Sequence, residues 1–189
     1  MKVVGFVASP RIDGNTAWVV DKILEGAKEH GAETEVWCSG NINLGPCKGC
    51  LSCVKTGRCI INDDMQKIYG ALKQADALVL GSPIYMGQMS AQAKMFTDRL
   101  FAQISPRFSP KFKEENAGKK LVLAFTQGNP DPNMFQTYFD YTKRMFELLE
   151  FDVKTVQVIE GTRNRPACER ADLPALLKSV GSSLVVPNE

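Results

Sequence analysis

Two hydrophobic periodicities alternate along the chain. Residues 2–8 form a nearly unbroken apolar run, which is typical of a parallel strand covered on both faces. The run ends at Ser9-Pro10, and residues 15–30 then place apolar side chains at the spacing of a helix with one buried side. The same alternation continues along the chain. It predicts strands at 33–38, 75–81, 120–126 and 152–158, and helices at 63–74, 90–104, 133–149 and 172–184.

Five strands that alternate with helices predict an α/β fold with a parallel sheet and helices on both of its faces. Because crossovers between parallel strands are right-handed, the carboxyl ends of all five strands should lie along one rim. We expect one domain, residues 1–189, since this length suits a single core. The one sizeable irregular stretch, residues 105–119, is basic and contains prolines. We expect it to be a solvated loop or, alternatively, a contact with a partner or a second subunit.

Composition and charge exclude several classes of function. The chain is 44% hydrophobic and 23% charged, which is ordinary for a globular protein. Its net charge of +2 is too small to indicate nucleic-acid binding. No apolar run approaches the roughly 18 residues that a membrane span needs. Residues 1–8 lack the architecture of a cleavable signal, so we expect a cytoplasmic protein with reduced thiols.

The loop after the first strand has the residue types of a phosphate site. Residues 9–16 read SPRIDGNT and open directly into a helix, whose unpaired amides and dipole favour an anion. The loop lacks both the G-x-x-x-x-G-K-[ST] and the G-x-G-x-x-G patterns, which disfavours a triphosphate and a dinucleotide. Hydroxyls, amides and one arginine suit a terminal phosphomonoester. The plain alternative is an ordinary strand-to-helix turn with a good N-cap.

Two further loops follow strands at the same rim. Residues 82–89 (SPIYMGQM) supply an aromatic ring, two methionines and a glycine, and residues 126–130 (TQGNP) supply amides. Ligands of open parallel sheets bind at the carboxyl ends of the strands, near the point where the strand order reverses. A phosphate cradle, an apolar wall and amide donors together suit a flat heteroaromatic ring with a phosphate tail. FMN is the natural candidate.

Four of the six cysteines lie within thirteen residues, in the spacing C-x2-C-x2-C-x5-C. They are Cys47, Cys50, Cys53 and Cys59. Thiolates at this density suit an iron–sulfur cluster, another soft metal or thiol redox chemistry. Basic residues and glycines interleave with them and would offset the charge of a cluster. Their loop, residues 39–62, follows the second strand, so we expect it to emerge at the rim that carries the proposed FMN site.

Other interpretations of the cysteines remain open. They can be reduced thiols of a structured loop. A zinc site usually takes its ligands from two separated knuckles, which this loop does not provide. A C-x-x-C dithiol is expected to precede a helix within a thioredoxin-like pattern, which is absent. The C-x5-C ending is also looser than that of ferredoxins, and no proline follows the last cysteine.

Taken together, these motifs resemble those of the flavodoxin-like NAD(P)H-dependent FMN reductases, and within them the iron–sulfur flavoprotein group. The resemblance spans roughly residues 1–130. It implies a flavodoxin-like three-layer fold with a five-stranded sheet of order 2-1-3-4-5 and FMN at the rim. It is carried by S-P-R-x-x-G-N-T at 9–16, C-x-G-C-x-x-C-x5-C at 47–59, Asp63-Asp64-Met65, S-P-I-Y at 82–85 and K-x-x-x-D-R at 94–99.

The resemblance also implies roles for individual residues. The phosphate would be held by Ser9, Arg11, Asn15 and Thr16, with Gly14 allowing the turn. The flavin ring would be lined by Pro83, Ile84, Tyr85, Met86 and Gly87 on one side and by Thr126, Gln127 and Gly128 on the other. Members with the cysteine motif hold a [4Fe–4S] cluster on it. Because FMN often lies at a subunit interface in this family, we expect a homodimer or a homotetramer.

The resulting expectation is an FMN-dependent oxidoreductase of the NAD(P)H-dependent FMN or quinone reductase type. NAD(P)H or a protein would donate electrons, and a small molecule or a protein would accept them. No side chain is assigned a catalytic role, because the cofactor carries the chemistry. The single histidine, His30, is expected to cap a helix. The alternatives are a flavodoxin-like electron carrier and a flavin-binding redox sensor, both without a cluster and without nicotinamide turnover.

Overall fold

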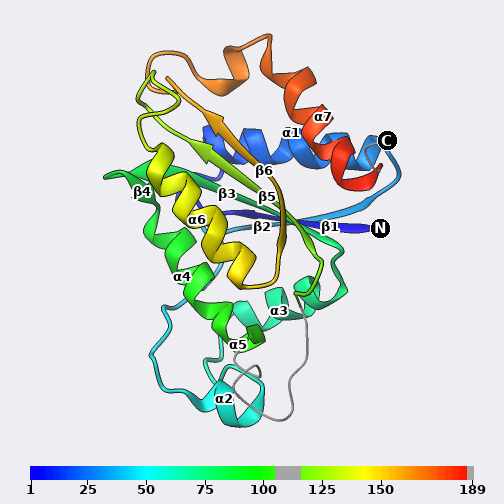
Figure 1. The fold of residues 1–189 in the computed structure, drawn as a ribbon, viewed down its shortest axis with the longest axis vertical. Coiled ribbons are helices and arrows are strands. Elements are labelled where there is room, and N and C mark those ends of the chain that lie inside the picture. Colours follow the sequence, from blue (N-terminus) through cyan, green and yellow to red (C-terminus); the bar gives the residue numbers. More distant parts are fainter. Residues whose placement is uncertain (105–115, 187–189) are drawn as a thin grey trace.

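The computed structural model describes residues 1–104 and 116–186. Its centre is a parallel sheet in the order β2-β1-β3-β5-β6 (Figure 1). Numbered along the five predicted strands this is 2-1-3-4-5, so the predicted order is confirmed. The predicted count is incomplete, because β4 (Gln88–Met89) adds a short strand antiparallel to the end of β3. The parallel strands are β1 (Lys2–Val7), β2 (Glu33–Cys38), β3 (Ala77–Tyr85), β5 (Lys120–Thr126) and β6 (Asp152–Ile159).

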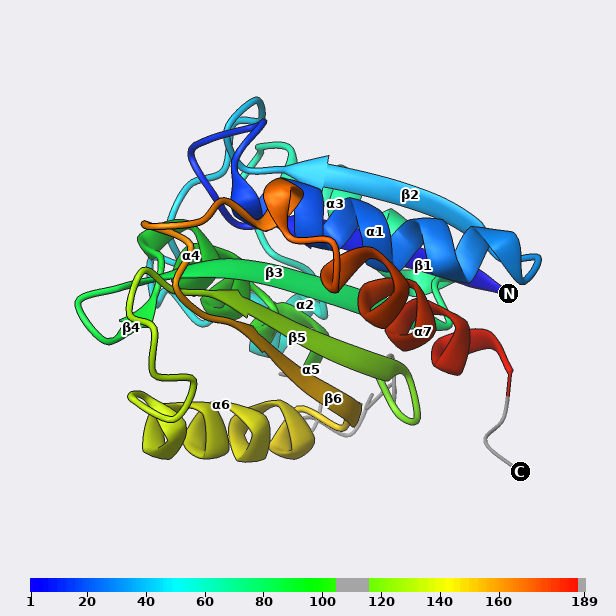
Figure 2. The ribbon, with the colours of Figure 1, turned by 90° about the horizontal axis from the view of Figure 1, so that it is seen from above.

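Helices cover both faces of the sheet. On one face α1 (Asn15–Glu29) and α7 (Leu173–Val185) lie side by side (Figure 2) and bury an apolar layer that includes Ile23 and Leu177. On the other face lie α3 (Met65–Gln74), α4 (Ala91–Arg99) and α6 (Gln136–Leu148). Their core includes Phe96, which stacks on Phe6 with ring centroids 4.1 Å apart. The three layers are those expected of a doubly wound α/β fold.

Glycines allow α1 and α7 to approach closely. A Cβ at Gly181 of α7 would lie 1.9 Å from the Ile23 carbonyl oxygen. A Cβ at Gly26 of α1 would lie 2.1 Å from the Lys178 carbonyl oxygen. Real Cβ atoms never approach backbone oxygen this closely, so neither position accepts a larger residue without separation of the two helices.

The largest differences between the predicted and the observed helices occur at three places. The helix expected over 90–104 divides at Leu100 into α4 and the short α5 (Phe101–Ile104). The helix expected to begin at 133 begins at Gln136. The cysteine loop contains a helix that the pattern did not predict, α2 (Ser52–Thr56). It is too short to show a helical hydrophobic period, and both of its caps have left-handed backbone geometry.

Residues 105–115, most of the stretch expected to be a solvated loop or a partner contact, lie outside the described residues. Among the residues that are described, no helix combines the length and the apolar character required to cross a bilayer.

Candidate functional site

The strand register brings the three predicted loops together. Val7 of β1 pairs with Gly81 of β3, and Pro83 of β3 pairs with Thr126 of β5. The Ala8 amide continues the ladder by donating to the Gly81 carbonyl at 2.8 Å. Since the strands are parallel, the segments that follow β1, β3 and β5 leave the sheet side by side at its carboxyl rim. We call this region the rim site.

The first loop of the rim site is tightly organised. Ser9 is buried, and its hydroxyl accepts a hydrogen bond from the Arg11 amide at 3.1 Å. Gly14 is the N-cap of α1 and has no side chain to cap the first-turn amides, which therefore remain suitable donors for an anion. The Arg11 side chain is exposed, and no ion pair joins it to a carboxylate of the described residues.

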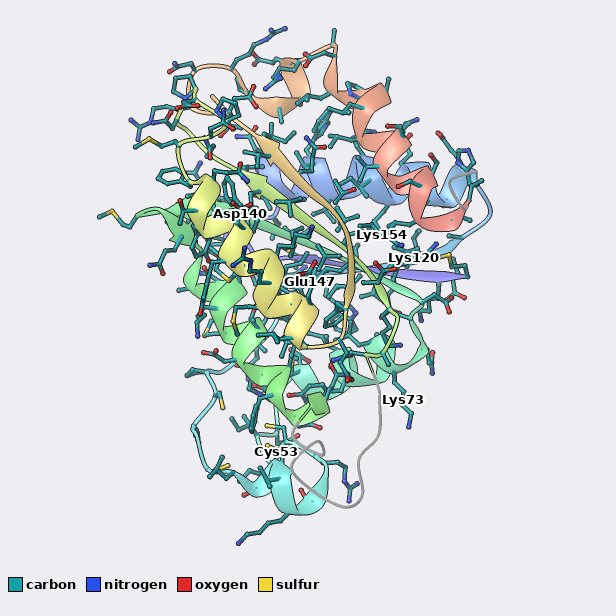
Figure 3. All side chains as sticks on the ribbon, viewed as in Figure 1. Cys53, Lys73, Lys120, Asp140, Glu147 and Lys154 are labelled. Atoms are coloured by element: carbon teal, nitrogen blue, oxygen red, sulfur yellow. The ribbon has the colours of Figure 1, made fainter. Side chains whose placement is uncertain are left out.

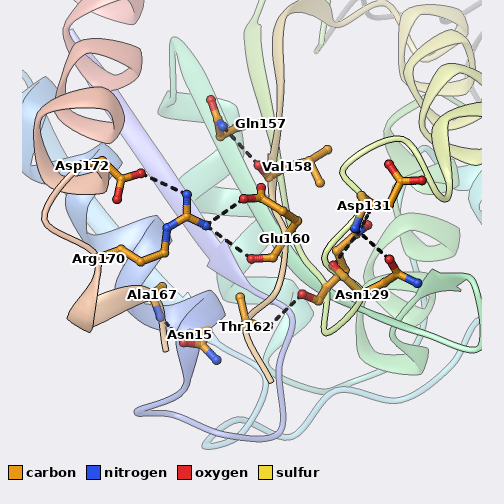
Figure 4. A network of polar contacts seen from close by, with 11 residues as sticks. Asn15, Asn129, Asp131, Gln157, Val158, Glu160, Thr162, Ala167, Arg170 and Asp172 are labelled. Atoms are coloured by element: carbon orange, nitrogen blue, oxygen red, sulfur yellow. Dashed lines mark hydrogen bonds and ion pairs between the residues drawn. The ribbon is translucent and has the colours of Figure 1, made fainter. Parts of the chain in front are cut away.

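The two remaining phosphate-loop candidates already have partners within the protein. The Thr16 and Thr126 hydroxyls are buried and lie 2.7 Å apart, so they join the start of α1 to the end of β5. Asn15 Oδ1 accepts a hydrogen bond from the Ala167 amide at 2.7 Å (Figure 4). The Asn15 side chain thereby anchors a segment more than 150 residues away, and only its Nδ2 end remains available as a donor.

The second loop is a hairpin between β3 and β4. Pro83 is buried, Ile84 is half-buried and Tyr85 is 49% exposed. Met86 and Gly87 form the two-residue turn with positive φ angles of 50° and 79°, as a type I′ turn requires. Met86 is a poor residue for this geometry and is fully exposed.

Hydrogen bonds hold the base of this hairpin. The Ser90 amide donates to the Ser82 hydroxyl at 3.0 Å, and the Ser90 hydroxyl donates to the Ala8 carbonyl at 2.6 Å. The Met89 amide donates to the Tyr138 hydroxyl at 3.0 Å. Sequence reasoning did not select Ser90 or Tyr138, because their contacts depend on the folded positions of α4 and α6.

The third loop contains a buried amide with an open acceptor. Gln127 is 1% exposed, and its Nε2 donates to the Asp131 carbonyl at 2.6 Å. Its Oε1 is buried and has no hydrogen-bond partner among the described residues. The Gln127 carbonyl accepts from the hydroxyl of Thr162, which follows β6. Gly128 is exposed at the outer side of this loop.

The segment after β6 contributes a residue that the sequence analysis missed. A Cβ placed on Gly128 would lie 3.4 Å from Arg163 Cβ and 3.8 Å from Arg163 Nε, so this arginine lies against the third loop. A nearby network, in which Arg170 donates to Glu160 and to Asp172 at 3.0 Å each, holds the segment (Figure 4). The strand-end rule could have found Arg163, because β6 is also parallel and ends at this rim.

The only histidine lies away from the rim. His30 follows the last turn of α1, and its Nδ1 is 2.9 Å from the Gly26 carbonyl oxygen. Because α1 runs back from the rim, this end of the helix is opposite the rim site. The expected capping position of His30 is confirmed, and no histidine is available for acid–base chemistry at the rim.

The cysteine loop begins at the rim but leaves it. The Ser39 hydroxyl donates to the Ser9 carbonyl at 3.0 Å, which joins the start of the loop to the segment that follows β1. The loop then descends along the face covered by α3 and α4, and α2 packs against α5 (Figure 1). The expectation that this loop emerges at the rim therefore holds for its first residues and not for its helix.

All four cysteines of the motif carry free thiols. Cys47 and Cys50 are exposed, whereas Cys53 and Cys59 are partly buried. Hydrogen bonds from the backbone and side chain of Ser52 lower the pKa of the Cys50 thiol. Within the described residues, the side chains of His, Cys, Asp and Glu do not gather in groups of three or more that suit a metal ion.

A buried ion pair lies at the base of the cysteine loop. Arg99 Nη1 and Nη2 donate to the two carboxylate oxygens of Asp63 at 2.7 and 2.9 Å, and both side chains are almost completely buried. Burial raises the pKa of Asp63. The Arg99 guanidinium and the amides of Gly45 and Met65 outweigh that effect and leave the pKa below its ordinary value. A second ion pair of α4, between Lys94 and Asp98, lies on the exposed side of the helix.

Proteins of similar sequence and similar structure are known. The sequence pattern of the family described as NADPH-dependent FMN reductase matches residues 1–132. The chain belongs to this family. Its sequence is 39% identical over 141 residues to an iron–sulfur flavoprotein of Methanosarcina thermophila, a match that covers 75% of this chain and 72% of that protein.

Another relative is less completely covered. An iron–sulfur flavoprotein of Methanocaldococcus jannaschii is 46% identical over 99 residues, which is 52% of this chain and only 51% of that protein. Among solved structures, an NAD(P)H:quinone oxidoreductase from Methanothermobacter marburgensis superposes with a TM-score of 0.75, covering 100% of this chain and 99% of that one. At 17% identity this likeness establishes the shared flavodoxin-like fold.

The match to the FMN reductase family includes every residue predicted to bind FMN and all four cysteines of the motif. It ends before α6, so the segment after β6 lies outside it. Arg163 and the Ala167 amide, which contact the rim site from that segment, therefore lie beyond the matched residues.

Proposed function

We propose that the protein is an FMN-dependent oxidoreductase with FMN bound at the rim site. The observation that carries the proposal is the convergence of three loops at the carboxyl rim of a sheet in a chain of the FMN reductase family. When bound, FMN supplies hydride and single-electron transfer. The chain would bind it, orient its ring and exclude water from one face.

The residues of the rim site fit this cofactor. The uncapped amides of α1, the Ser9 hydroxyl and the exposed Arg11 form a donor set that suits a phosphomonoester. Gln127 Oε1 is a buried acceptor without a partner among the described residues, and the polar edge of the flavin ring carries an N–H donor. An unsatisfied buried acceptor is unfavourable, so a ligand that supplies a donor would be favoured there.

A comparison of two flavins tests the proposal. The apoprotein, titrated by flavin fluorescence, should bind FMN about 100-fold or more tightly than riboflavin, because several charge-assisted hydrogen bonds reach the phosphate. Arg11→Gln should weaken FMN binding severalfold and leave riboflavin binding unchanged, and Arg144→Gln on the exposed side of α6 is the matched control. Equal affinities for the two flavins, or no binding of either, would overturn the assignment.

We further propose that Cys47, Cys50, Cys53 and Cys59 hold a [4Fe–4S] cluster. The donor set fits, because four free thiols lie on one loop with solvent access, and the relatives carry the name iron–sulfur flavoprotein. Since these side chains are not gathered in the structure, binding would have to draw them together. Anaerobically purified protein should contain about four iron and four acid-labile sulfide atoms per chain. Flavin-loaded protein without either would contradict this proposal.

Membership of a family described as NADPH-dependent supports NADPH or NADH as the electron donor. Steady-state oxidation of each nucleotide, with free flavin or a quinone as acceptor, distinguishes a reductase from a flavodoxin-like carrier. Turnover supports the reductase, and stable reduction by dithionite without nucleotide turnover would favour the carrier or the redox sensor. The cytoplasmic location and the homodimer or homotetramer stay predictions, which fractionation and light scattering would test.

A further inference from the structure

The buried ion pair of Arg99 and Asp63 holds the entrance of the cysteine loop. Gly45 lies two residues before the first cysteine, and Asp63 Oδ2 accepts its amide at 2.9 Å. Arg99 Nη1 donates to the carbonyl of the same residue, also at 2.9 Å. Both polar groups of Gly45 are therefore held by one ion pair, which joins the loop to α4 and to the start of α3.

The neighbouring Asp64 strengthens this attachment. Its carboxylate accepts the Asn43 amide at 2.9 Å, and its own amide donates to the Asn43 carbonyl at 3.0 Å. The consecutive residues Asp63 and Asp64 thus form hydrogen bonds with the backbone of Gly45 and of Asn43, respectively. The entrance to the loop is fixed by these four hydrogen bonds and by the ion pair of Arg99 with Asp63.

The exit of the cysteine loop is held by side chains of α3. Gln66 Nε2 donates to the carbonyl of Cys59 at 3.0 Å and to that of Ile61 at 2.7 Å. One turn further along α3, the Tyr69 hydroxyl donates to the Arg99 carbonyl at 2.6 Å.

The first turns of α3 and the end of α4 therefore fix both ends of the segment formed by residues 46–58. Cys47 lies just inside one end of this segment and Cys59 just outside the other, with Cys50 and Cys53 between them. Cys53 is part of α2 and is labelled in Figure 3. Closing a loop of this length in advance removes an entropic penalty that ligand assembly would otherwise carry.

Stability alone does not explain this ion pair. A buried salt bridge is weak support for folding, because desolvation offsets much of the attraction between the charges. Arg99 Nε is also buried without a hydrogen-bond partner among the described residues. The contacts of the pair are directed instead to the segment that leads into the cysteines.

We propose that Arg99 and Asp63 are positioning residues of the cysteine loop. This pair, which we call the clamp, joins the two ends of the loop so that the four thiols can bind the cluster together. This inference rests on the proposed cluster. Neither side chain ligates iron. Their loss should weaken cluster binding about 10- to 100-fold, as is typical when partners behind the metal ligands are removed.

The test compares variants of the full-length protein under anaerobic reconstitution with limiting ferrous iron and sulfide. Arg99→Met and Asp63→Asn should both load fewer iron and sulfide atoms per chain than the wild type, and the double variant should be no worse than either. Arg99→Lys, which keeps the charge but not the paired geometry, should load an intermediate amount. Lys94→Met breaks the exposed pair on the same helix and is the matched control.

Two readouts separate positioning from general damage. FMN content should be unchanged in Arg99→Lys and Asp63→Asn, because the rim site does not include the clamp. The cluster of Arg99→Lys should also have a midpoint potential different from that of the wild type. Wild-type loading and potential in all the clamp variants would overturn the inference.

Thiol alkylation keeps the clamp testable even if the wild-type protein binds no iron. In cluster-free protein, mass spectrometry should show Cys59 alkylated severalfold faster in Asp63→Asn and Arg99→Lys than in the wild type, with Lys94→Met unchanged. Absence of iron from the wild type would refute the cluster alone. Equal alkylation rates in all variants would refute the clamp, whatever the iron content.

Discussion

At the scale of single residues, Met86 stands out because its backbone and its side chain are both unfavourably placed. It adopts φ of 50° in the turn between β3 and β4, and its side chain is fully exposed. Left-handed geometry costs an ordinary residue roughly 1 kcal/mol, whereas glycine and asparagine accept it readily. A methionine there gains nothing from packing within the described chain. Contact with the flavin ring would explain its presence.

Replacement of Met86 separates these two effects. Met86→Asn should raise the free energy of unfolding by about 1 kcal/mol, measured by chemical denaturation of the apoprotein. The same change should weaken FMN binding severalfold in a fluorescence titration. Gly87→Ala is the opposing control, because its φ of 79° makes a side chain unfavourable and the variant should be less stable. A Met86→Asn protein with unaltered FMN affinity would remove Met86 from the site.

Asp63 gives a second prediction at this scale, on the dependence of stability on pH. Its pKa is lower in the folded protein than the ordinary value of 3.8. The stability that it contributes is therefore complete above about pH 4 and is lost as the pH falls through the lowered pKa. Unfolding measured between about pH 5 and pH 2 should show wild-type protein losing more stability than Asp63→Asn.

The control for this measurement is the Arg99→Met background. Burial alone raises the pKa of a carboxyl group, so removal of the guanidinium should abolish or reverse the difference between aspartate and asparagine at position 63. An identical pH dependence of the wild type and Asp63→Asn would show that the ion pair does not lower this pKa.

At the scale of elements, the close contact between α1 and α7 depends on glycines at positions 26 and 181. Gly181→Ala should lower the free energy of unfolding by about 3 kcal/mol or more, because its Cβ would overlap backbone atoms of α1. Gly70 provides the matched control on the exposed side of α3, where a Cβ meets no atom within 4 Å. Gly70→Ala should raise stability by about 0.5–1 kcal/mol through helix propensity. Equal effects of the two substitutions would contradict the close helix contact.

At the scale of the whole molecule, the sheet and its rim loops could be predicted because their signals are local. Unbroken apolar runs identify the buried strands, and parallel pairing sends the segments after β1, β3 and β5 to one rim. The short β4 has too few residues to show a period. The partners of Asn15 and Thr16 were not predictable, since Ala167 and Thr126 approach them only in the folded sheet.

The course of the cysteine loop was hidden for the same reason. Its sequence shows the ligand spacing but not the contact of Gly45 with Arg99, which lies 54 residues further along the chain. That contact attaches the loop to α4, on the face of the sheet covered by α3 and α4. Sequence spacing therefore identified the candidate ligands, whereas the course of their loop along α3 and α4 depends on tertiary contacts.

The separation of the two regions leads to a final prediction, that FMN binding does not require the cysteines. The start of the cysteine loop contacts β1 and the segment after it, where Ser39 donates hydrogen bonds to the Val7 and Ser9 carbonyls, whereas α2 packs against α5. Serine at positions 47, 50, 53 and 59 should therefore leave the FMN dissociation constant within about twofold of the wild-type value, because the donors at the rim are unaltered. Ser39→Ala, which removes the hydroxyl at the junction, should weaken binding more than the fourfold serine variant. If the serine variant lost FMN instead, the cysteine loop would have to form part of the flavin site, and the two proposed redox centres could not be assembled independently.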